Sequence, residues 1–272
     1  MIIHGLKIEP NAVLNYANLS KAKMDMVSLS GAGLIGAELN GVDLRFSNLN
    51  NAVMACSVLE GADLSGSDLS EVNILAGAGH GSIFIGANLN QSNLMLADFS
   101  FATLSNAQVN NADLRGINFI NANLLSASIT NARLDFCDCS QANLDKVDFS
   151  GSNLTGTQII RSSARWAIFT SAILNLCDAS WTNFYESKFI GSSCFQANFS
   201  NANMTNTNFS GANLMNANCY GTNFQKAKFS NANMDGINLS KANLRDTEIT
   251  FEQLSYAASL TGTIMPDGSI HR

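Results

Sequence analysis

A period of five residues runs through almost the whole chain, and it limits the possible folds more than any other feature. Stepping by five from Leu14, a large apolar residue recurs at nearly every step, without insertion or deletion, as far as Ile249. Two residues before each of these centre positions, from Ala12 onward, lies a small residue, most often Ala or Ser. The other three positions are mostly polar, typically with Asn or Asp directly before the centre. The repeated unit is therefore A(N/D)Lxx.

This period fits neither a helix, which repeats about every 3.6 residues, nor a flat strand, which repeats about every two. One large and one small inward residue in every five, separated by turn-forming Asn, Asp and Gly, indicate a chain that bends at each repeat and coils on itself. Successive coils would pair like parallel strands, about 4.8 Å apart. Pro10 and Pro266, the two prolines, lie outside the repeat, as a continuous ladder of backbone donors requires.

The repeat resembles that of the pentapeptide repeat proteins. Residues 12–251 carry the resemblance, and segments such as GANLNQSNLMLADFS and NANMTNTNFSGANLMNANCYGTNF are very specific for that family. The resemblance implies an all-β fold, a right-handed quadrilateral parallel β-helix with four pentapeptides in each coil. At four per coil, the 48 pentapeptides counted in the sequence make about 12 coils.

The chain ends depart from the repeat and are expected to cover the open ends of the coil stack. We expect an N-terminal cap at 1–11, the β-helix at 12–251, and a short C-terminal capping helix with a tail at 252–272. Thr250 and Gln253 have the spacing of a helix capping box, and Phe251, Leu254 and Ala258 would form one helical face. The helix would act as a lid over the last coil, and it also offers a surface for a homodimer.

Composition and motifs argue against catalysis, cofactors, membranes and nucleic acid. The chain has no apolar run of membrane-spanning length and no signal-peptide pattern at its start, so we expect a soluble, cytoplasmic protein. Its net charge of −6 provides no basic surface for nucleic acid. No catalytic or phosphate-binding motif is present, and we expect no enzyme activity, cofactor or metal.

The six cysteines fall on the repeat in a way that favours reduced packing residues over disulfides or metal ligands. Five occupy centre or small positions and should point inward, while Cys56 should point outward. The inward five are Cys137, Cys139, Cys177, Cys194 and Cys219.

One stretch, Gly77–Gly81, is irregular, because Gly77 and Gly79 replace a small and a large core residue. It could be a ligand-binding notch beside His80. The alternative that we favour is a local bulge or bend in the stack.

Outward residues between 160 and 195 form a candidate surface for a protein partner, because exposed aromatic and Arg side chains often anchor interfaces. A 20-residue coil would place Arg161 next to Trp181, and Arg165 next to Tyr185, in cation–π contact. A packed surface seam without a partner is the open alternative. The candidate residues are Arg161, Arg165, Trp166, Trp181, Tyr185, Ile190 and Phe195.

Two functions follow from these features. The first is a non-enzymatic scaffold that presents the aromatic surface to a protein partner. The second comes from the resemblance, which implies that some members mimic B-DNA and bind gyrase or a related topoisomerase, conferring resistance to quinolones or gyrase poisons. A length of B-DNA equal to 12 coils carries roughly 31 negative charges, whereas the net charge of this chain is −6. Because the chain has far less negative charge than DNA, we favour the scaffold. The candidate acidic face for DNA mimicry consists of Glu38, Asp98, Asp138 and Asp178.

Overall fold

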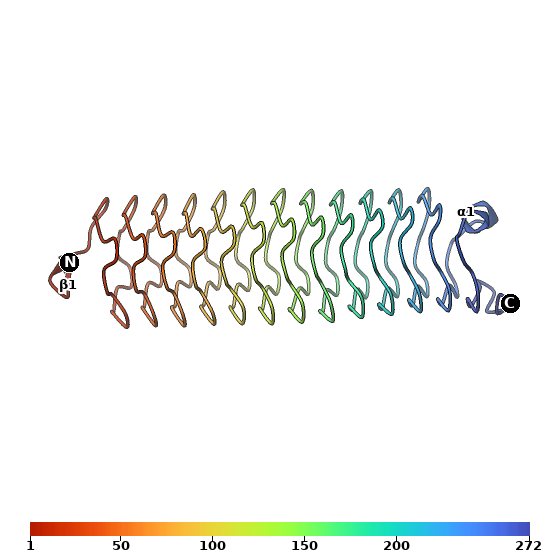
Figure 1. Ribbon diagram of the computed structural model, residues 1–272, viewed down its shortest axis with the longest axis horizontal. Coiled ribbons are helices and arrows are strands. Elements are labelled where there is room, and N and C mark those ends of the chain that lie inside the picture. Colours follow the sequence, from red (N-terminus) through yellow and green to blue (C-terminus); the bar gives the residue numbers. More distant parts are fainter. The chain divides into compact units, whose positions relative to one another are not determined.

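The protein is built from stacked coils of backbone held together by parallel β-bridges (Figure 1). The computed structural model describes all 272 residues and divides them into two compact units, Met1–Asp138 and Cys139–Arg272. Within each unit, the residue directly before a repeat centre pairs with the residue 20 positions later, as Val13 does with Gly33. Four pentapeptides therefore make one coil, and each unit is a parallel β-helix.

Every pentapeptide from the centre Leu14 to the centre Leu244 turns at the second residue after its centre, which adopts a left-handed backbone conformation. At Tyr16, for example, φ is 60°, and the amide of Ala17 donates to the carbonyl of Leu14 at 3.1 Å. The tight turn requires a positive φ at its third residue, a conformation that Gly and Asn adopt at the least cost. Bulky residues such as Phe46 and Trp166 also occupy it, with φ of 55° and 58°. The neighbouring coils hold them there through ladder hydrogen bonds.

The repeat centres form the core, and most of them are completely buried. In the second unit, five phenylalanines 20 residues apart stack face to face, with ring centroids 4.6 to 5.6 Å apart. Their separation is close to the spacing of parallel strands, so the coil repeat itself brings the rings into contact. These residues are Phe149, Phe169, Phe189, Phe209 and Phe229.

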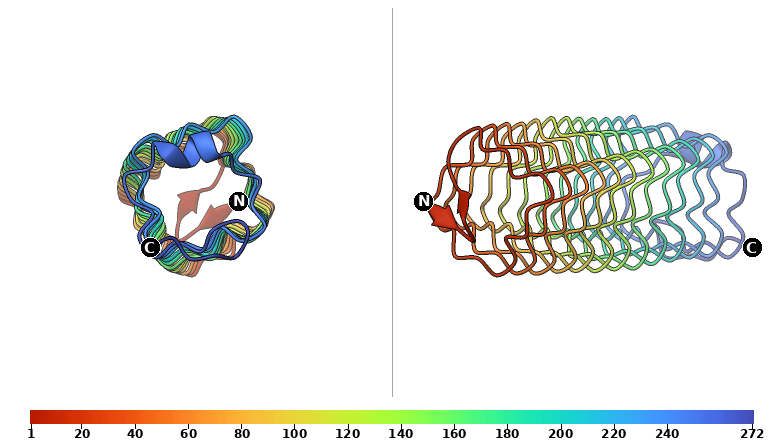
Figure 2. Two further views of the ribbon diagram at one scale, coloured as in Figure 1. Left: turned by 90° about the vertical axis from the view of Figure 1, so that its right-hand side faces the viewer. Right: turned by 60° about the vertical axis from the view of Figure 1, so that its left-hand side comes forward.

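A short hairpin precedes the first coil. Strands β1 (Ile2–Ile3) and β2 (Leu6–Lys7) pair antiparallel, joined by His4 and Gly5, both of which have positive φ. Two consecutive left-handed residues match the two-residue turn that suits the twist of a hairpin. Figure 2 shows the hairpin at the N-terminal end of the coils, and Ile8, which follows it, is buried.

The helix α1 spans Phe251–Ser255 and begins with the expected capping box, in which Thr250 and Gln253 bond reciprocally. The side-chain amide of Gln253 also donates to the backbone carbonyls of Phe229 and Ala232, at 2.7 and 3.0 Å. Carbonyls that would otherwise lie open at the edge of a coil thus receive donors from the helix. None of the helical structure in the protein has the length and apolar character of a membrane span.

The prediction that Phe251, Leu254 and Ala258 form one helical face is confirmed only for Leu254 and is wrong for the other two residues. Leu254 is buried, but Phe251 is 87% exposed and Ala258 lies outside the helix. The helix is short because the chain rejoins the ladder after Ser255, where the amide of Ala258 donates to the carbonyl of Ile237 at 2.9 Å. Farther on, the tail turns at Pro266–Gly268, and Ile264 pairs with Ile270.

The expected bulge at Gly77–Gly81 was also wrong. Ala78 bridges both Val58 and Asp98, and the amide of Gly79 donates to Asp98 at 2.7 Å, so the ladder is uninterrupted. A Cβ atom at Gly79 would lie only 2.6 Å from the ring of Phe99. Gly79 therefore leaves space for a large neighbour, and the coil keeps its regular path.

Candidate interaction surface

Six polar and aromatic side chains of the second unit form one connected group around Trp166, which we call the Trp166 cluster. The Trp166 ring lies 5.1 Å from the Arg165 guanidinium carbon, 5.8 Å from Lys146 Nζ and 6.2 Å from the Tyr185 ring, edge to face. Its indole N–H donates to Glu186 at 3.0 Å. The cluster consists of Asp145, Lys146, Arg165, Trp166, Tyr185 and Glu186.

Asp145 lies at the base of the cluster and is nearly fully buried. Its carboxylate accepts hydrogen bonds from the Ser163 hydroxyl at 2.6 Å, from the Arg165 amide at 2.9 Å and from the Arg165 guanidinium. Burial alone would raise the pKa of Asp145, but the hydrogen bonds from Arg165 and Ser163 outweigh it, and the pKa is lowered. The carboxylate is therefore charged at neutral pH and fixes the guanidinium against the face of Trp166.

Glu186 closes the other side of the cluster. Hydrogen bonding to this carboxylate raises the pKa of the Tyr185 hydroxyl, because phenolate formation would place two negative charges together. The exposed edge of the cluster thus consists of the neutral Tyr185 phenol beside the Trp166 ring. Trp166 is 40% exposed. Both side chains combine an apolar body with a hydrogen-bonding end, a combination that suits a contact surface.

The expected cation–π pairs were wrong. Arg165 lies over Trp166 instead of Tyr185, because its two guanidinium hydrogen bonds to Oδ2 of Asp145 direct the guanidinium toward the preceding coil. No cation–π contact joins Arg161 to Trp181. Arg161 and Trp181 are both exposed, Trp181 at 60%, and they occupy the turn that precedes the cluster along the coil.

Ile190 and Phe195 lie apart from the cluster. They follow the centres Phe189 and Cys194, whose repeats belong to the next two ladders around the coil. Ile190 is exposed and Phe195 is partly exposed. The seven predicted residues therefore divide into the cluster, the adjacent turn and two separate positions.

Sequence reasoning did not identify Asp145, Lys146 and Glu186 as parts of the surface. The 20-residue coil repeat is the signal that could have found them. It places Asp145 beside Arg165, and Lys146 and Glu186 on either side of Trp166.

The candidate acidic face is divided between the two units. Glu38, Asp98 and Asp138 belong to one column of the first unit, whereas Asp178 belongs to the second unit. Asp98 accepts a hydrogen bond from the Asn118 side chain at 2.9 Å and from the Ser100 amide at 3.0 Å. Its carboxylate is thus part of a ladder of side-chain amides, a role that Asn fills at the same position elsewhere.

Asp178 is bonded in the same way, by the Asn198 side chain at 3.0 Å and the Ser180 amide at 3.0 Å. The ladder continues from Asn198 to Asn218 and Asn238 through side-chain amides alone. The four acidic residues thus belong to columns in which polar side chains also stabilise adjacent coils.

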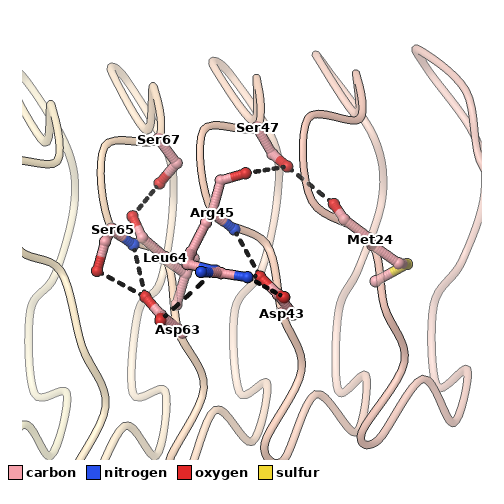
Figure 3. A network of polar contacts seen from close by, with 8 residues as sticks. All are labelled: Met24, Asp43, Arg45, Ser47, Asp63, Leu64, Ser65 and Ser67. Carbon is pink, nitrogen blue, oxygen red and sulfur yellow. Dashed lines mark hydrogen bonds and ion pairs between the residues drawn. The ribbon is translucent and has the colours of Figure 1, made fainter.

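Other acidic residues of the first unit are neutralised by arginines. Arg45 forms a bidentate pair with Asp43, at 2.8 and 2.7 Å, and its Nε lies 3.8 Å from Asp63 in the next coil (Figure 3). The hydrogen bond from Arg45 lowers the pKa of Asp43. Arg115 pairs with Asp113 in the same manner, at 2.6 Å.

The net charge of the protein is concentrated in the first unit. Residues 1–138 contain twelve acidic and six basic residues, so this unit accounts for the whole net charge of −6. Residues 139–272 contain nine of each and are neutral overall. The two units thus present surfaces of different charge, and the Trp166 cluster lies on the neutral one.

The cysteines lie where the repeat predicts. Five thiols are buried and Cys56 is exposed. Burial raises the pKa of Cys194 to about 12 and also raises that of Cys177, so these thiols are protonated at neutral pH.

The family model for pentapeptide repeats matches eight copies, which together cover well over half of the chain. The matched residues are 37–74, 80–107, 97–135, 132–175, 192–231 and 222–255. Comparison with curated protein sequences gives no significant match.

Three solved structures illustrate the likeness. HetL, a pentapeptide repeat protein involved in heterocyst differentiation regulation in the cyanobacterium Nostoc, is 27% identical, with 97% of this chain and 94% of HetL covered and a TM-score of 0.39. A trypsin-treated form of QnrB1, a plasmid-mediated fluoroquinolone resistance protein, is 17% identical over 66% of this chain and 88% of its own, with a TM-score of 0.44. A pentapeptide repeat protein from the thylakoid lumen of Arabidopsis thaliana is 24% identical over 44% and 69%, with a TM-score of 0.22.

Proposed function

Because the chain belongs to the pentapeptide repeat family, whose members are repeat scaffolds, we propose that it is a non-enzymatic scaffold that binds a protein partner through the Trp166 cluster and the adjacent Trp181. The observation that carries this proposal is the exposure of two tryptophans at neighbouring turns of one coil surface. Trp166 is 40% exposed and Trp181 is 60% exposed. Large aromatic side chains left in water are typical anchors of protein interfaces.

The cluster is also prepared for binding. Ion pairs and ring contacts already orient Arg165, Trp166 and Tyr185, so a partner would lose little side-chain entropy by docking on them. Trp181 has no ring or cation–π contact within the protein, so a partner could bury its exposed ring. Asp145 and Arg165 form an ion pair, while Lys146 lies over the Trp166 ring and Glu186 accepts its indole N–H, an arrangement that favours recognition over chemistry.

DNA mimicry is the second candidate, and the charges favour it less. The acidic residues Asp43, Asp63 and Asp113 are paired with arginines, and the second unit has no net charge. A DNA mimic needs a dense and continuous row of unpaired negative charge. The acidic face of Glu38, Asp98, Asp138 and Asp178 remains the surface that this candidate would use.

The test compares two sets of variants of the full chain. Affinity capture from the source cell extract, quantified by mass spectrometry, should lose its specific partner when Trp181 and Tyr185 are both changed to Ala. The control, Tyr220→Ala, removes another partly exposed aromatic side chain that lies against Lys241, away from the cluster, and should leave capture unchanged. Retention of every specific protein by the double variant would contradict the proposal.

The DNA-mimic candidate is tested with purified gyrase by calorimetry at low salt. Changing Asp98, Asp138 and Asp178 together to Asn removes three charges while keeping an oxygen that can accept the hydrogen bonds at Asp98 and Asp178. Gyrase binding that is lost in this triple variant, and kept in the aromatic variant, would establish mimicry and exclude the scaffold interpretation.

We also propose the finer architecture that the repeat implies: about 12 coils at four pentapeptides each, with the β1–β2 hairpin and α1 closing the two ends. The domain limits are 1–11, 12–251 and 252–272, and the setting is the cytoplasm. The bond between Gln253 and the carbonyl of Phe229 supports a closing role for α1. An end closed in this way would remain free to form a homodimer contact through its outer side.

A further inference from the structure

One side of the first unit carries a mostly apolar surface that contains no charged residue. It consists of the outward side chains in five repeats that follow one another in a single ladder, and we call it the apolar face. Its outward side chains are ten apolar residues, three asparagines and two glycines, and none is charged. The five segments are 13–16, 33–36, 53–56, 73–76 and 93–96.

The other three sides of the same five coils are different. Each carries charged residues, such as Asp43 and Arg45 on one side and Asp68 and Glu71 on another. The apolar face ends where charge returns to its own ladder, at the ion pair of Asp113 with Arg115. An apolar surface confined to one of four equivalent sides is therefore a specific feature of this unit.

Much of this surface is in contact with water. Tyr16 is 78% exposed, Val13 is 82% exposed and Leu96 is 61% exposed, while Cys56 and Val53 lie between them along the ladder and are also exposed. A monomeric protein has little reason to keep so many apolar side chains together on one side.

The polar groups of the apolar face are largely satisfied internally. The Asn73 side chain accepts from the Leu75 amide at 3.1 Å and from the Asn93 side chain at 3.2 Å, and Asn15 accepts from the Ile35 amide at 2.9 Å. Covering the face would therefore leave few hydrogen-bonding groups without a partner. The ladder already uses the backbone donors, so an added strand would find no free edge here.

Acidic residues flank the apolar face. Glu71 lies in the turn that precedes it, and Glu38 and Asp98 lie in the ladder that follows it. The unit as a whole has a net charge of −6. A second copy, or an anionic membrane surface, would bring like charges together around the contact.

We propose that the apolar face binds an amphipathic helix of another protein, one whose apolar stripe is flanked by Lys or Arg. Five coils span about 19 Å along the ladder, and a helix covers that distance in about 13 residues. The helix pitch of about 5.4 Å is close to the coil spacing of about 4.8 Å, so each turn would meet one coil. Basic flanks would face Glu38, Glu71 and Asp98. This surface is separate from the Trp166 cluster, so either proposal can fail alone.

The probe is a synthetic helical peptide of about 14 residues, with Leu at helical spacing on one face and Lys on both flanks. A matched peptide carries Glu in place of Lys. Binding is followed by fluorescence anisotropy and by the alkylation rate of Cys56, which is the exposed thiol of the protein and lies within the apolar face. The Lys peptide should bind and slow alkylation, and the Glu peptide should bind at least about tenfold more weakly.

The variant Leu75→Lys should weaken binding of the Lys peptide by about tenfold or more, because it places a positive charge in the apolar face. Ile85→Lys adds the same charge at the same repeat position two ladders farther around the coil, on the opposite side, and should have little effect. Ala55→Lys repeats the test at a second position of the face, and the double variant Trp181→Ala with Tyr185→Ala should bind like the parent.

Three results would overturn the proposal. Equal binding of the Lys and Glu peptides would show that the contact is not selective for charge. Sedimentation showing a dimer that Leu75→Lys abolishes would assign the face to a second copy. Displacement of the Lys peptide by phosphatidylserine vesicles, but not by neutral vesicles, would assign it to a lipid surface.

Discussion

Phe99 fills the space that a side chain at Gly79 would need, since a Cβ atom at Gly79 would lie 2.6 Å from two carbons of the Phe99 ring. The two residues occupy the same column in adjacent coils. Phe99 also stacks on Phe84, with centroids 5.0 Å apart, and therefore has little room to move. Gly79, the one glycine at a repeat centre, thus provides the space that the Phe99 ring of the next coil occupies.

Gly79→Ala should therefore destabilise the protein by about 1–3 kcal/mol through overpacking, although Ala is otherwise a good core residue. Urea unfolding monitored by circular dichroism measures the change. The double variant Gly79→Ala with Phe99→Leu should recover part of the loss, because the smaller side chain vacates the contested space. Equal stability of Gly79→Ala and the parent would contradict this packing.

Phe189→Ala should cost about 3–5 kcal/mol, because Phe189 is completely buried in the phenylalanine stack. Its ring lies 4.7 Å from that of Phe169 and 4.6 Å from that of Phe209, and no neighbour can fill the gap without breaking a stacked pair. Ile190→Ala, at the adjacent outward position, is the control and should change stability by less than about 0.5 kcal/mol. Similar denaturation midpoints for the two variants would refute the inward assignment.

Thiol titration of the native protein should modify one cysteine rapidly, and all six only after unfolding. Cys56 is exposed, whereas burial raises the pKa of Cys194 to about 12 and prevents thiolate formation. Reaction with a chromogenic disulfide reagent, with and without denaturant, gives both counts. In Cys56→Ser the rapid reaction should disappear, and rapid labelling of a second thiol would show that a buried position opens.

Asp145→Asn should reduce stability by about 1 kcal/mol at neutral pH, by removing the ion pair with the partly exposed Arg165. The amide can keep the other contacts, because Asn175 accepts from the Ser193 hydroxyl and the Phe195 amide in the equivalent geometry. Chemical denaturation at pH 7 measures the difference in stability. Asn175→Ala serves for comparison, because it removes the side-chain oxygen that accepts these hydrogen bonds at the equivalent position.

The contribution of Asp145 should also depend on pH. Its folded-state pKa lies below the ordinary value of 3.8, so its stabilisation is fully present above that value and is lost as pH falls through the folded pKa. The stabilities of the parent and Asp145→Asn should therefore differ at pH 7 and converge in strong acid. A difference that stays constant over this range would show that the charge of Asp145 plays no part.

The sequence alone determined which residues point inward. The five-residue period predicted burial of centres such as Leu114 and Phe189 and exposure of Cys56, and the structure confirms each of them. This was possible because the register never slips, so one local pattern assigns every position. The capping box of Thr250 with Gln253 was predictable for the same reason, since its residues are near neighbours in the chain.

The tertiary structure decided how outward residues of different coils meet. Arg165 faces Trp166 instead of Tyr185 because Asp145, 20 residues earlier, directs its guanidinium. Gly79 is regular instead of bulged because Phe99, 20 residues later, fills its space. Both outcomes depend on side-chain direction across the stack, which the local pattern does not encode. A five-residue repeat assigns each residue a side of the backbone, whereas contact between coils is set by the shapes and charges that stacking brings together.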